Sequence, residues 1–128
     1  MKLRIRGNSI RLRLTQSEVA QFGKTGKVCE TVEFGYAKPG LSYQLYSTVE
    51  DETMQARFEN NCLYVGVPIV DAEHWVNSDV VQIEARQALD GDGILRILVE
   101  KDFACLTERE NEDDSDSFMN PLSQANCG

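Results

Sequence analysis

Two stretches of this chain, residues 8–32 and 61–85, carry the same order of features: a strand, a short helix with an aromatic residue, a polar turn and a second strand. They align without a gap, so that Phe22 falls on Trp75, 53 residues later. One such unit is too small to bury its own apolar face, so the two units are expected to pack together. The repeat therefore predicts a small, single, β-rich domain made by internal duplication, barrel-like and of the α+β class.

Length and composition set the limits of this domain. The chain has 128 residues, of which 41% are hydrophobic and 27% charged, as in an ordinary globular protein. We expect a folded body over residues 1–106 and an acidic tail over 107–128. The longest apolar run is too short to span a membrane, and the first residues are too charged for a signal peptide. A cytoplasmic protein with no membrane contact and with reduced cysteines is expected.

The net charge of -8 conceals two opposite ends. Residues 1–28 hold seven basic side chains and the single acid Glu18, whereas the segment from Asp102 onward holds seven acids and only Arg109. A basic head and an acidic tail on one chain call for a common explanation.

The basic head has the pattern of a β-hairpin. Apolar and basic residues alternate over 2–6 and 9–14, and Gly7-Asn8 between them suits a tight turn. Pairing around that turn places Arg4 opposite Arg11 and Lys2 opposite Arg13. Thr15 and Glu18 then form a capping box at the start of the first short helix.

The second half predicts further strands and one more helix. Strands are expected over 41–48 and 55–59, joined as an additional hairpin, and over 62–67. Asp71 is the expected N-cap of the second helix. Strand 94–100 would close the sheet.

The residues Arg6-Gly7-Asn8-Ser9 and the strand Ile10–Leu14, followed by a short helix, resemble the AbrB/MazE family of swapped-hairpin transcription regulators. In that family two chains each supply one strand–helix–strand unit, so this chain resembles a fused pseudo-dimer. The chain departs from the pattern at Thr15, where the family usually has proline, and in the second unit, which has Glu59-Asn60-Asn61-Cys62 in place of the Gly-Asn-Ser turn.

The whole chain also resembles a bacterial family of short proteins with no assigned function. The resemblance rests on three segments, residues 4–11, 99–106 and 112–121. It implies no particular chemistry.

The basic strands provide the candidate site. Like charges on directly opposite strand positions repel, so such a face favours an anionic partner or full solvation. The AbrB/MazE resemblance implies DNA; an acidic protein is the other partner considered. The acidic tail is a rival for the same surface, at high effective concentration, and is expected to gate it. A monomer or weak homodimer is expected. The candidate residues for binding the anion or partner are Lys2, Arg4, Arg6, Asn8, Arg11 and Arg13.

The alternative is a metal-binding protein that uses the tail. Asp113, Asp114 and Asp116 supply hard oxygen ligands for a divalent metal, and Cys105 supplies a soft one, but the glycine and final glutamate of a calcium loop are missing. No nucleophile, phosphate-loop or dinucleotide motif is present, and the one histidine, His74, has no partner motif. A non-enzymatic protein without a resident cofactor is therefore expected.

Overall fold

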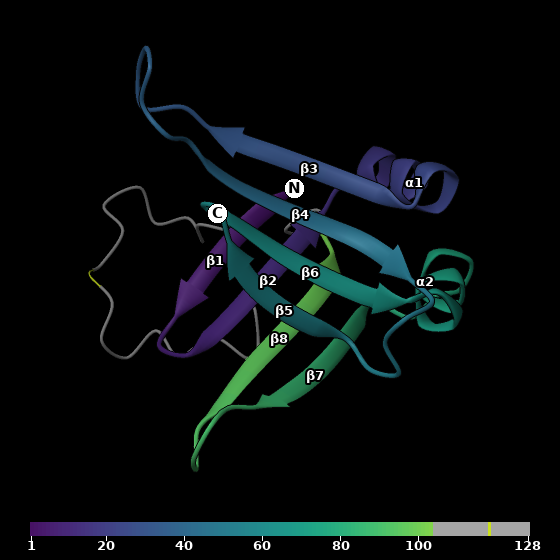
Figure 1. Ribbon diagram of the computed structural model, residues 1–128. Helices are drawn as coiled ribbons and strands as arrows, with labels where there is room; N and C mark the ends of the chain where they lie inside the picture. Colours follow the sequence, from purple (N-terminus) through teal and green to yellow (C-terminus); the bar gives the residue numbers. More distant parts are fainter. Residues whose placement is uncertain (104–117, 119–128) are drawn as a thin grey trace.

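The computed structural model describes residues 1–103 and residue 118. This part of the chain contains eight strands and two helices (Figure 1). In chain order they are β1 (Lys2–Arg6), β2 (Ser9–Leu14), α1 (Gln16–Thr25), β3 (Lys27–Val32), β4 (Leu41–Thr48), β5 (Gln55–Glu59), β6 (Cys62–Pro68), α2 (Ile69–Val76), β7 (Gln82–Ala88) and β8 (Ile94–Lys101).

The strands form two separate four-stranded sheets rather than the expected closed, barrel-like arrangement. Sheet 1 has the order β1-β2-β8-β7, and sheet 2 has the order β3-β4-β6-β5. In each sheet the two central strands run parallel and the outer strands pair with them antiparallel. The α+β, strand-rich class predicted from the sequence is confirmed.

Residues 41–59 do not form the predicted hairpin. Strand β6 lies between β4 and β5 and pairs with both, in parallel with β4 and antiparallel with β5. Similarly, β8 is a central strand of sheet 1 that pairs in parallel with β2. Both errors have one cause: a parallel neighbour is distant in the chain and leaves no turn residues in the sequence.

The two halves of the chain place corresponding strands at corresponding positions. Strands β1 and β2 of sheet 1 match β5 and β6 of sheet 2, and Lys2 opposite Arg13 corresponds to Gln55 opposite Gly66 at the same 53-residue spacing. Each half thus sends its second hairpin into the sheet that the other half begins.

After the helices this spacing changes. Val28 pairs with Leu45 in sheet 2, and Ile83 pairs with Val99 in the corresponding position of sheet 1, so β3 and β7 match at 55 residues. The second half uses residues 77–81 between helix and strand where the first uses only Gly26. This longer connection supplies the Val81 carbonyl that accepts a hydrogen bond from the indole Nε1 of Trp75, at 3.0 Å.

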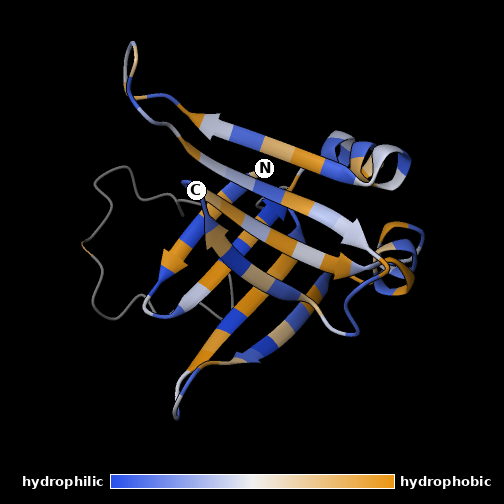
Figure 2. Ribbon diagram, viewed as in Figure 1, coloured by the Kyte–Doolittle hydropathy of each residue, from blue (hydrophilic) through white to orange (hydrophobic). Residues whose placement is uncertain are grey.

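The core lies between the two sheets, and the helices cover one end of it (Figure 1). Hydrophobic and hydrophilic residues alternate along the strands, as Figure 2 shows, which gives each sheet one apolar face. The aromatic rings of Phe22 and Trp75 meet edge to face with centroids 6.1 Å apart, so the equivalent anchors of the two helices contact each other. Next to them, a Cβ on Gly23 would lie 2.7 Å from Val76 Cγ1.

The helix starts test two predictions about capping. Thr15 and Glu18 form the predicted capping box, with side chain and backbone bonded reciprocally. Helix α2 begins earlier than expected, at Ile69 after Pro68, so Asp71 lies within the first turn and is not the N-cap. Because Pro68 provides no side-chain acceptor, this helix start has no side-chain cap bond.

Candidate functional site: a basic sheet face

The outer face of sheet 1 carries all five basic residues of the N-terminal hairpin. Leu3, Leu12, Val99 and Ile83 belong to or pack against the core, so the alternate residues of the same strands point outward. The strand register arranges these outward residues in three rows. The rows are Lys2–Arg13–Glu100–Gln82, Arg4–Arg11–Leu98–Glu84 and Arg6–Ser9–Arg96–Arg86. We call this surface the basic face, because seven of these twelve positions are cationic and two are acidic.

The predicted juxtaposition of like charges is present. Lys2 lies opposite Arg13, and Arg4 lies opposite Arg11. The sequence did not reveal that Glu100 of β8 lies next to both arginines of β2. Its Oε1 accepts a hydrogen bond from Arg13 Nε at 2.5 Å and lies 3.6 Å from Arg11 Nε. Arg13 and Glu100 are only 7% and 9% exposed, so this pair is part of the structure of the face rather than a free binding group.

At the helix end of the face, the chain leaves the sheet beside Lys2. The carboxylate of Asp102 lies 3.3 Å from Lys2 Nζ, and its backbone N–H donates to the Leu14 carbonyl at 2.8 Å. The first acid of the acidic C-terminal segment is therefore already paired with the basic face. The six acids that follow it, beginning with Glu108, lie outside the residues that the structure describes.

The opposite end of the face contains two arginines that the sequence reasoning did not select, Arg86 of β7 and Arg96 of β8. They lie directly opposite each other. Glu84 lies near both, 3.3 Å from Arg96 Nη2 and 3.8 Å from Arg86 Nε. The hydrogen bond from Arg96 is the main cause that lowers the pKa of Glu84, and it outweighs the opposing effect of burial. Only the parallel pairing of β8 with β2 brings these arginines to the N-terminal hairpin.

Asn8 has a structural role at this end. Its side-chain Nδ2 donates to the Ile94 carbonyl at 2.9 Å, and its own carbonyl accepts from the Arg96 N–H at 3.1 Å. These two bonds attach the β1–β2 turn to the start of β8. Asn8 was selected from the sequence as a partner-binding residue, and in the structure it holds Arg6 and Arg96 in a fixed relation.

A second group of charges lies away from the basic face, around the Met1 amino group. This group is bonded to Glu18 and to Glu30, the latter at 3.0 Å. Burial alone would lower the pKa of the amino group, but the hydrogen bonds with the two carboxylates outweigh it and raise that pKa. Burial, with a hydrogen bond to Glu30, raises the pKa of Tyr43 to about 12. Each group in this network has a partner, which indicates a structural role.

The outer face of sheet 2 differs chemically from the basic face at matching positions. Gly66 stands where sheet 1 has Arg13, and the ring of Tyr46 lies over it, 2.8 Å from where a Cβ would be. Tyr64 stands where sheet 1 has Arg11, in edge contact with Tyr46, and Arg57 lies 4.5 Å from its ring centroid. Sheet 2 therefore offers no second basic face.

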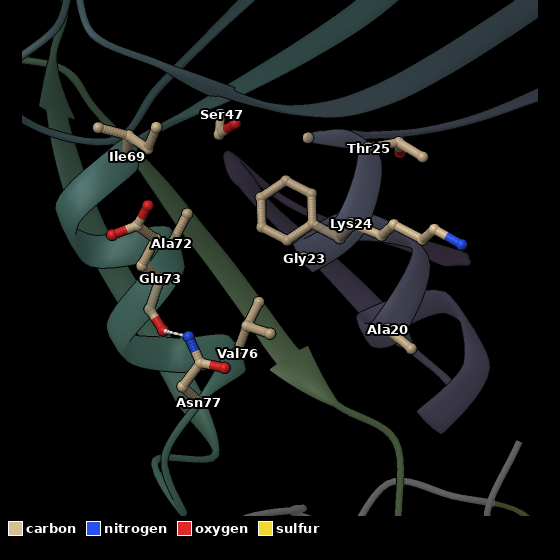
Figure 3. Close-up of a pocket in the computed structure, with 12 residues that line it drawn as sticks. Ala20, Gly23, Lys24, Thr25, Ser47, Ile69, Ala72, Glu73, Val76 and Asn77 are labelled. Atoms are coloured by element: carbon tan, nitrogen blue, oxygen red, sulfur yellow. Dashed lines mark hydrogen bonds between the residues drawn. The ribbon is translucent and has the colours of Figure 1, made fainter.

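A cavity of about 500 Å³ opens between the two helices (Figure 3). Its walls are mixed, with small or apolar residues such as Ala20 and Gly23 of α1 and Ile69 and Val76 of α2 next to polar ones. Glu73 is on α2, and its carbonyl accepts from the Asn77 side chain at 2.9 Å. Lys24, Thr25 and Ser47 add further polar groups to the lining.

The other candidate residues give no site among the described residues. Cys105, Asp113, Asp114 and Asp116 of the predicted metal site lie outside them, and residues 1–103 contain no group of three or more metal-ligating side chains. His74 is exposed. Cys62 is buried, whereas Cys29 is exposed, because it lies on the outer face of edge strand β3. No helix in this part of the chain is long and apolar enough to cross a membrane.

Comparison with known proteins gives a family but no activity. No curated protein and no solved structure matches the chain. The model of a family of unknown function, DUF7009, matches residues 1–122, which include both sheets, both helices and all the acidic residues of the C-terminal segment. The prediction of a family without an assigned function is thus confirmed, and the chain belongs to the DUF7009 family.

Proposed function

We propose that this protein is a non-enzymatic binding protein that holds a polyanion, with nucleic acid as its partner, on the basic face of sheet 1. The observation that carries the proposal is the gathering of seven cationic side chains on one sheet face of a chain whose net charge is -8; six of them lie outside the buried Arg13–Glu100 pair. Flat arrays of arginine and lysine bind phosphate backbones through charge and counterion release.

The distribution of charge along the chain explains how a protein with a negative net charge can still bind a polyanion. Residues 104–128 contain Arg109 and six acids, a net charge of -5, which leaves -3 for residues 1–103. Most of the long-range repulsion of a polyanion therefore originates in the tail. A binding face with a separate acidic segment is the arrangement expected if the segment controls access.

We propose that the acidic tail competes with the partner for the basic face. The ion pair of Asp102 with Lys2 holds the chain at the edge of this face, shortly before the tail begins. Acids that are tethered there act at a high effective concentration and must be displaced before a polyanion binds. The six acids concerned are Glu108, Glu110, Glu112, Asp113, Asp114 and Asp116.

We further infer that the fold arose by duplication of an AbrB/MazE-like unit. Matching strand order in the two sheets and the contact of the equivalent residues Phe22 and Trp75 support this origin. The duplication is unequal in chemistry, since Gly66 and Tyr64 replace the arginines of the basic face. One chain is therefore expected to bind one partner segment as a monomer or weak homodimer.

The proposal is tested by fluorescence anisotropy with labelled duplex DNA, for the full chain and for a full chain in which the six tail acids are changed to Gln or Asn. The neutralised variant should bind about tenfold more tightly or better, and affinity should fall steeply between about 50 and 200 mM salt. The salt slope is the slope of the logarithm of the affinity against the logarithm of the salt concentration. Changing Arg4 and Arg11 to Gln in that variant should reduce the size of this slope by about 1 for each phosphate that is no longer bound.

Arg57→Gln is the matched control, because Arg57 is an exposed strand arginine on the outer face of sheet 2. Its binding should equal that of the parent. Absence of salt-dependent binding from both the full chain and the neutralised variant would overturn the proposed function. Binding of a poly-glutamate peptide without binding of DNA would instead identify an acidic protein as the partner.

A further inference from the structure

The third row of the basic face brings together three arginines from three strands. Arg6 of β1, Ser9 of β2, Arg96 of β8 and Arg86 of β7 are consecutive neighbours across sheet 1. Neighbouring strands are about 4.8 Å apart, so the long side chains of Arg6 and Arg96, on either side of Ser9, can reach the space above its hydroxyl. The row unites the first and the last strands of the described chain.

This row is held in place by the bonds of Asn8. The Asn8 side chain and carbonyl bind Ile94 and Arg96, and Asn8 directly follows the Arg6-Gly7 step of the turn. Gly7 has a φ of 55°, which a glycine adopts without strain. The backbones that carry Arg6 and Arg96 are therefore fixed relative to each other before any ligand arrives.

The charges of the row are not balanced within the protein. Arg86 and Arg96 face each other directly, which is unfavourable for like charges, and the single carboxylate of Glu84 serves both. Arg6 is exposed and forms no ion pair with a described residue. Three guanidinium groups against one carboxylate leave an excess of two positive charges at one edge of the sheet.

We infer that Arg6, Ser9, Arg86 and Arg96 form a subsite for one backbone phosphate of the nucleic acid, and that Asn8 is its positioning residue. This inference rests on the proposed function and extends its surface from the N-terminal hairpin across the whole of sheet 1. Guanidinium groups bind phosphate through paired, charge-assisted hydrogen bonds, and the serine hydroxyl adds a donor. Glu84 then occupies the two arginines in the absence of the phosphate and opposes its binding.

The first experiment compares duplex DNA binding by R86Q/R96Q with R57Q, both in the full chain with neutralised tail acids. Loss of the charge-assisted bonds should weaken binding roughly tenfold or more and reduce the salt slope by about 1. R57Q should bind like the parent. Arg86 and Arg96 are exposed, so their replacement should leave the fold intact, and the melting temperature of each variant checks this.

The second experiment uses the opposite sign of effect. Glu84→Gln removes the competing carboxylate and should tighten DNA binding several-fold, roughly 2- to 10-fold. Asn8→Ala should weaken binding and should leave the salt slope nearly unchanged, because it removes positioning and no charge. If Glu84 had a merely structural role, its replacement by Gln would not increase the affinity for DNA.

The outcomes separate the inference from the function on which it rests. If R4Q/R11Q weakens binding while R86Q/R96Q and E84Q both behave like the parent, the subsite is wrong and the basic face stands. If neither the parent nor the tail-neutralised chain binds DNA in a salt-dependent way, the proposed function itself fails.

Discussion

Arg13 and Glu100 form a buried ion pair across the parallel strands β2 and β8, with a hydrogen bond of 2.5 Å from Arg13 Nε to Glu100 Oε1. This pair joins the first basic hairpin to a strand almost 90 residues later. It therefore connects the stability of the fold with the charge of the proposed binding face.

Removal of one partner of this pair should be costly. Glu100→Leu leaves Arg13 buried without its main counter-charge, so the free energy of unfolding should fall by about 3–5 kcal/mol. The double variant R13L/E100L should recover most of that loss, because two apolar residues of similar size can replace a buried pair at little cost. Urea unfolding of R13L, of E100L and of the double variant gives the interaction energy between the two residues. Equal losses in the single and double variants would contradict this role.

Gly23 and Val76 make the closest contact between the helices. Gly23→Ala adds a methyl group 2.7 Å from Val76 Cγ1, which should destabilise the protein by about 1–3 kcal/mol. The double variant G23A/V76A relieves the clash and adds a better helix former, so it should be more stable than V76A by about 1 kcal/mol. Thermal unfolding of the three variants measures both effects. If G23A alone raises the melting temperature, the helices have more room than this contact allows.

Gln87 joins the edges of the two sheets. Its side-chain Oε1 accepts from the Ala56 N–H at 2.7 Å, and its Nε2 donates to the Ala56 carbonyl at 2.9 Å. Gln87→Ala leaves this backbone pair of edge strand β5 without its partners and should cost about 1–3 kcal/mol. Hydrogen exchange of the Ala56 amide should accelerate in the variant, while that of the Val99 amide in the centre of sheet 1 should change less. An unchanged exchange rate of the Ala56 amide would show that the Gln87 side chain is not required to protect it.

The pH dependence of stability should reflect the Met1–Glu18 pair. Burial would raise the pKa of Glu18, but hydrogen bonds from the Met1 amino group and from Thr15 lower it below its ordinary value of 4.5. The stability that this carboxylate contributes is therefore complete above pH 4.5 and is lost as the pH falls through the lowered value. The pKa of the Met1 amino group is raised above 8.0, so its contribution is complete below pH 8.0 and is lost as the pH rises through the raised value.

Glu18→Gln tests this dependence. Relative to the parent, the variant should show a smaller fall in unfolding free energy as the pH is lowered. It should also show a smaller fall as the pH is raised through the pKa of the Met1 amino group, because that group keeps only Glu30. Glu33→Gln, which removes an exposed carboxylate in the β3–β4 loop, is a control for the change in net charge. Parallel pH profiles for E18Q and the parent would exclude this ion pair as the source.

The sequence predicted those parts of the molecule that depend on neighbouring residues. The turn at Gly7-Asn8 set the register that puts Arg4 opposite Arg11, and Thr15 with Glu18 marked the start of α1 correctly. In each case the determining residues are within a few positions of each other, so local patterns are sufficient.

The parts that depend on parallel pairing could not be predicted in this way. The sequence around Arg86 and Arg96 has no feature that assigns these residues to the same sheet as Arg6, and Glu100 gives no sign that it lies beside Arg13. Both follow from the pairing of β2 with β8, whose residues are distant in sequence. The basic face was therefore predicted in its N-terminal half and missed in its C-terminal half.

The contact of Gly23 with Val76 also limits how such a chain can assemble. These residues hold matching positions in the two halves, so a half that paired with its own copy would set two valines, or two glycines, against each other. Two valines would collide and two glycines would leave a gap. Each half is thus shaped for its unlike neighbour, which disfavours a pairing of either half with the same half of a second chain.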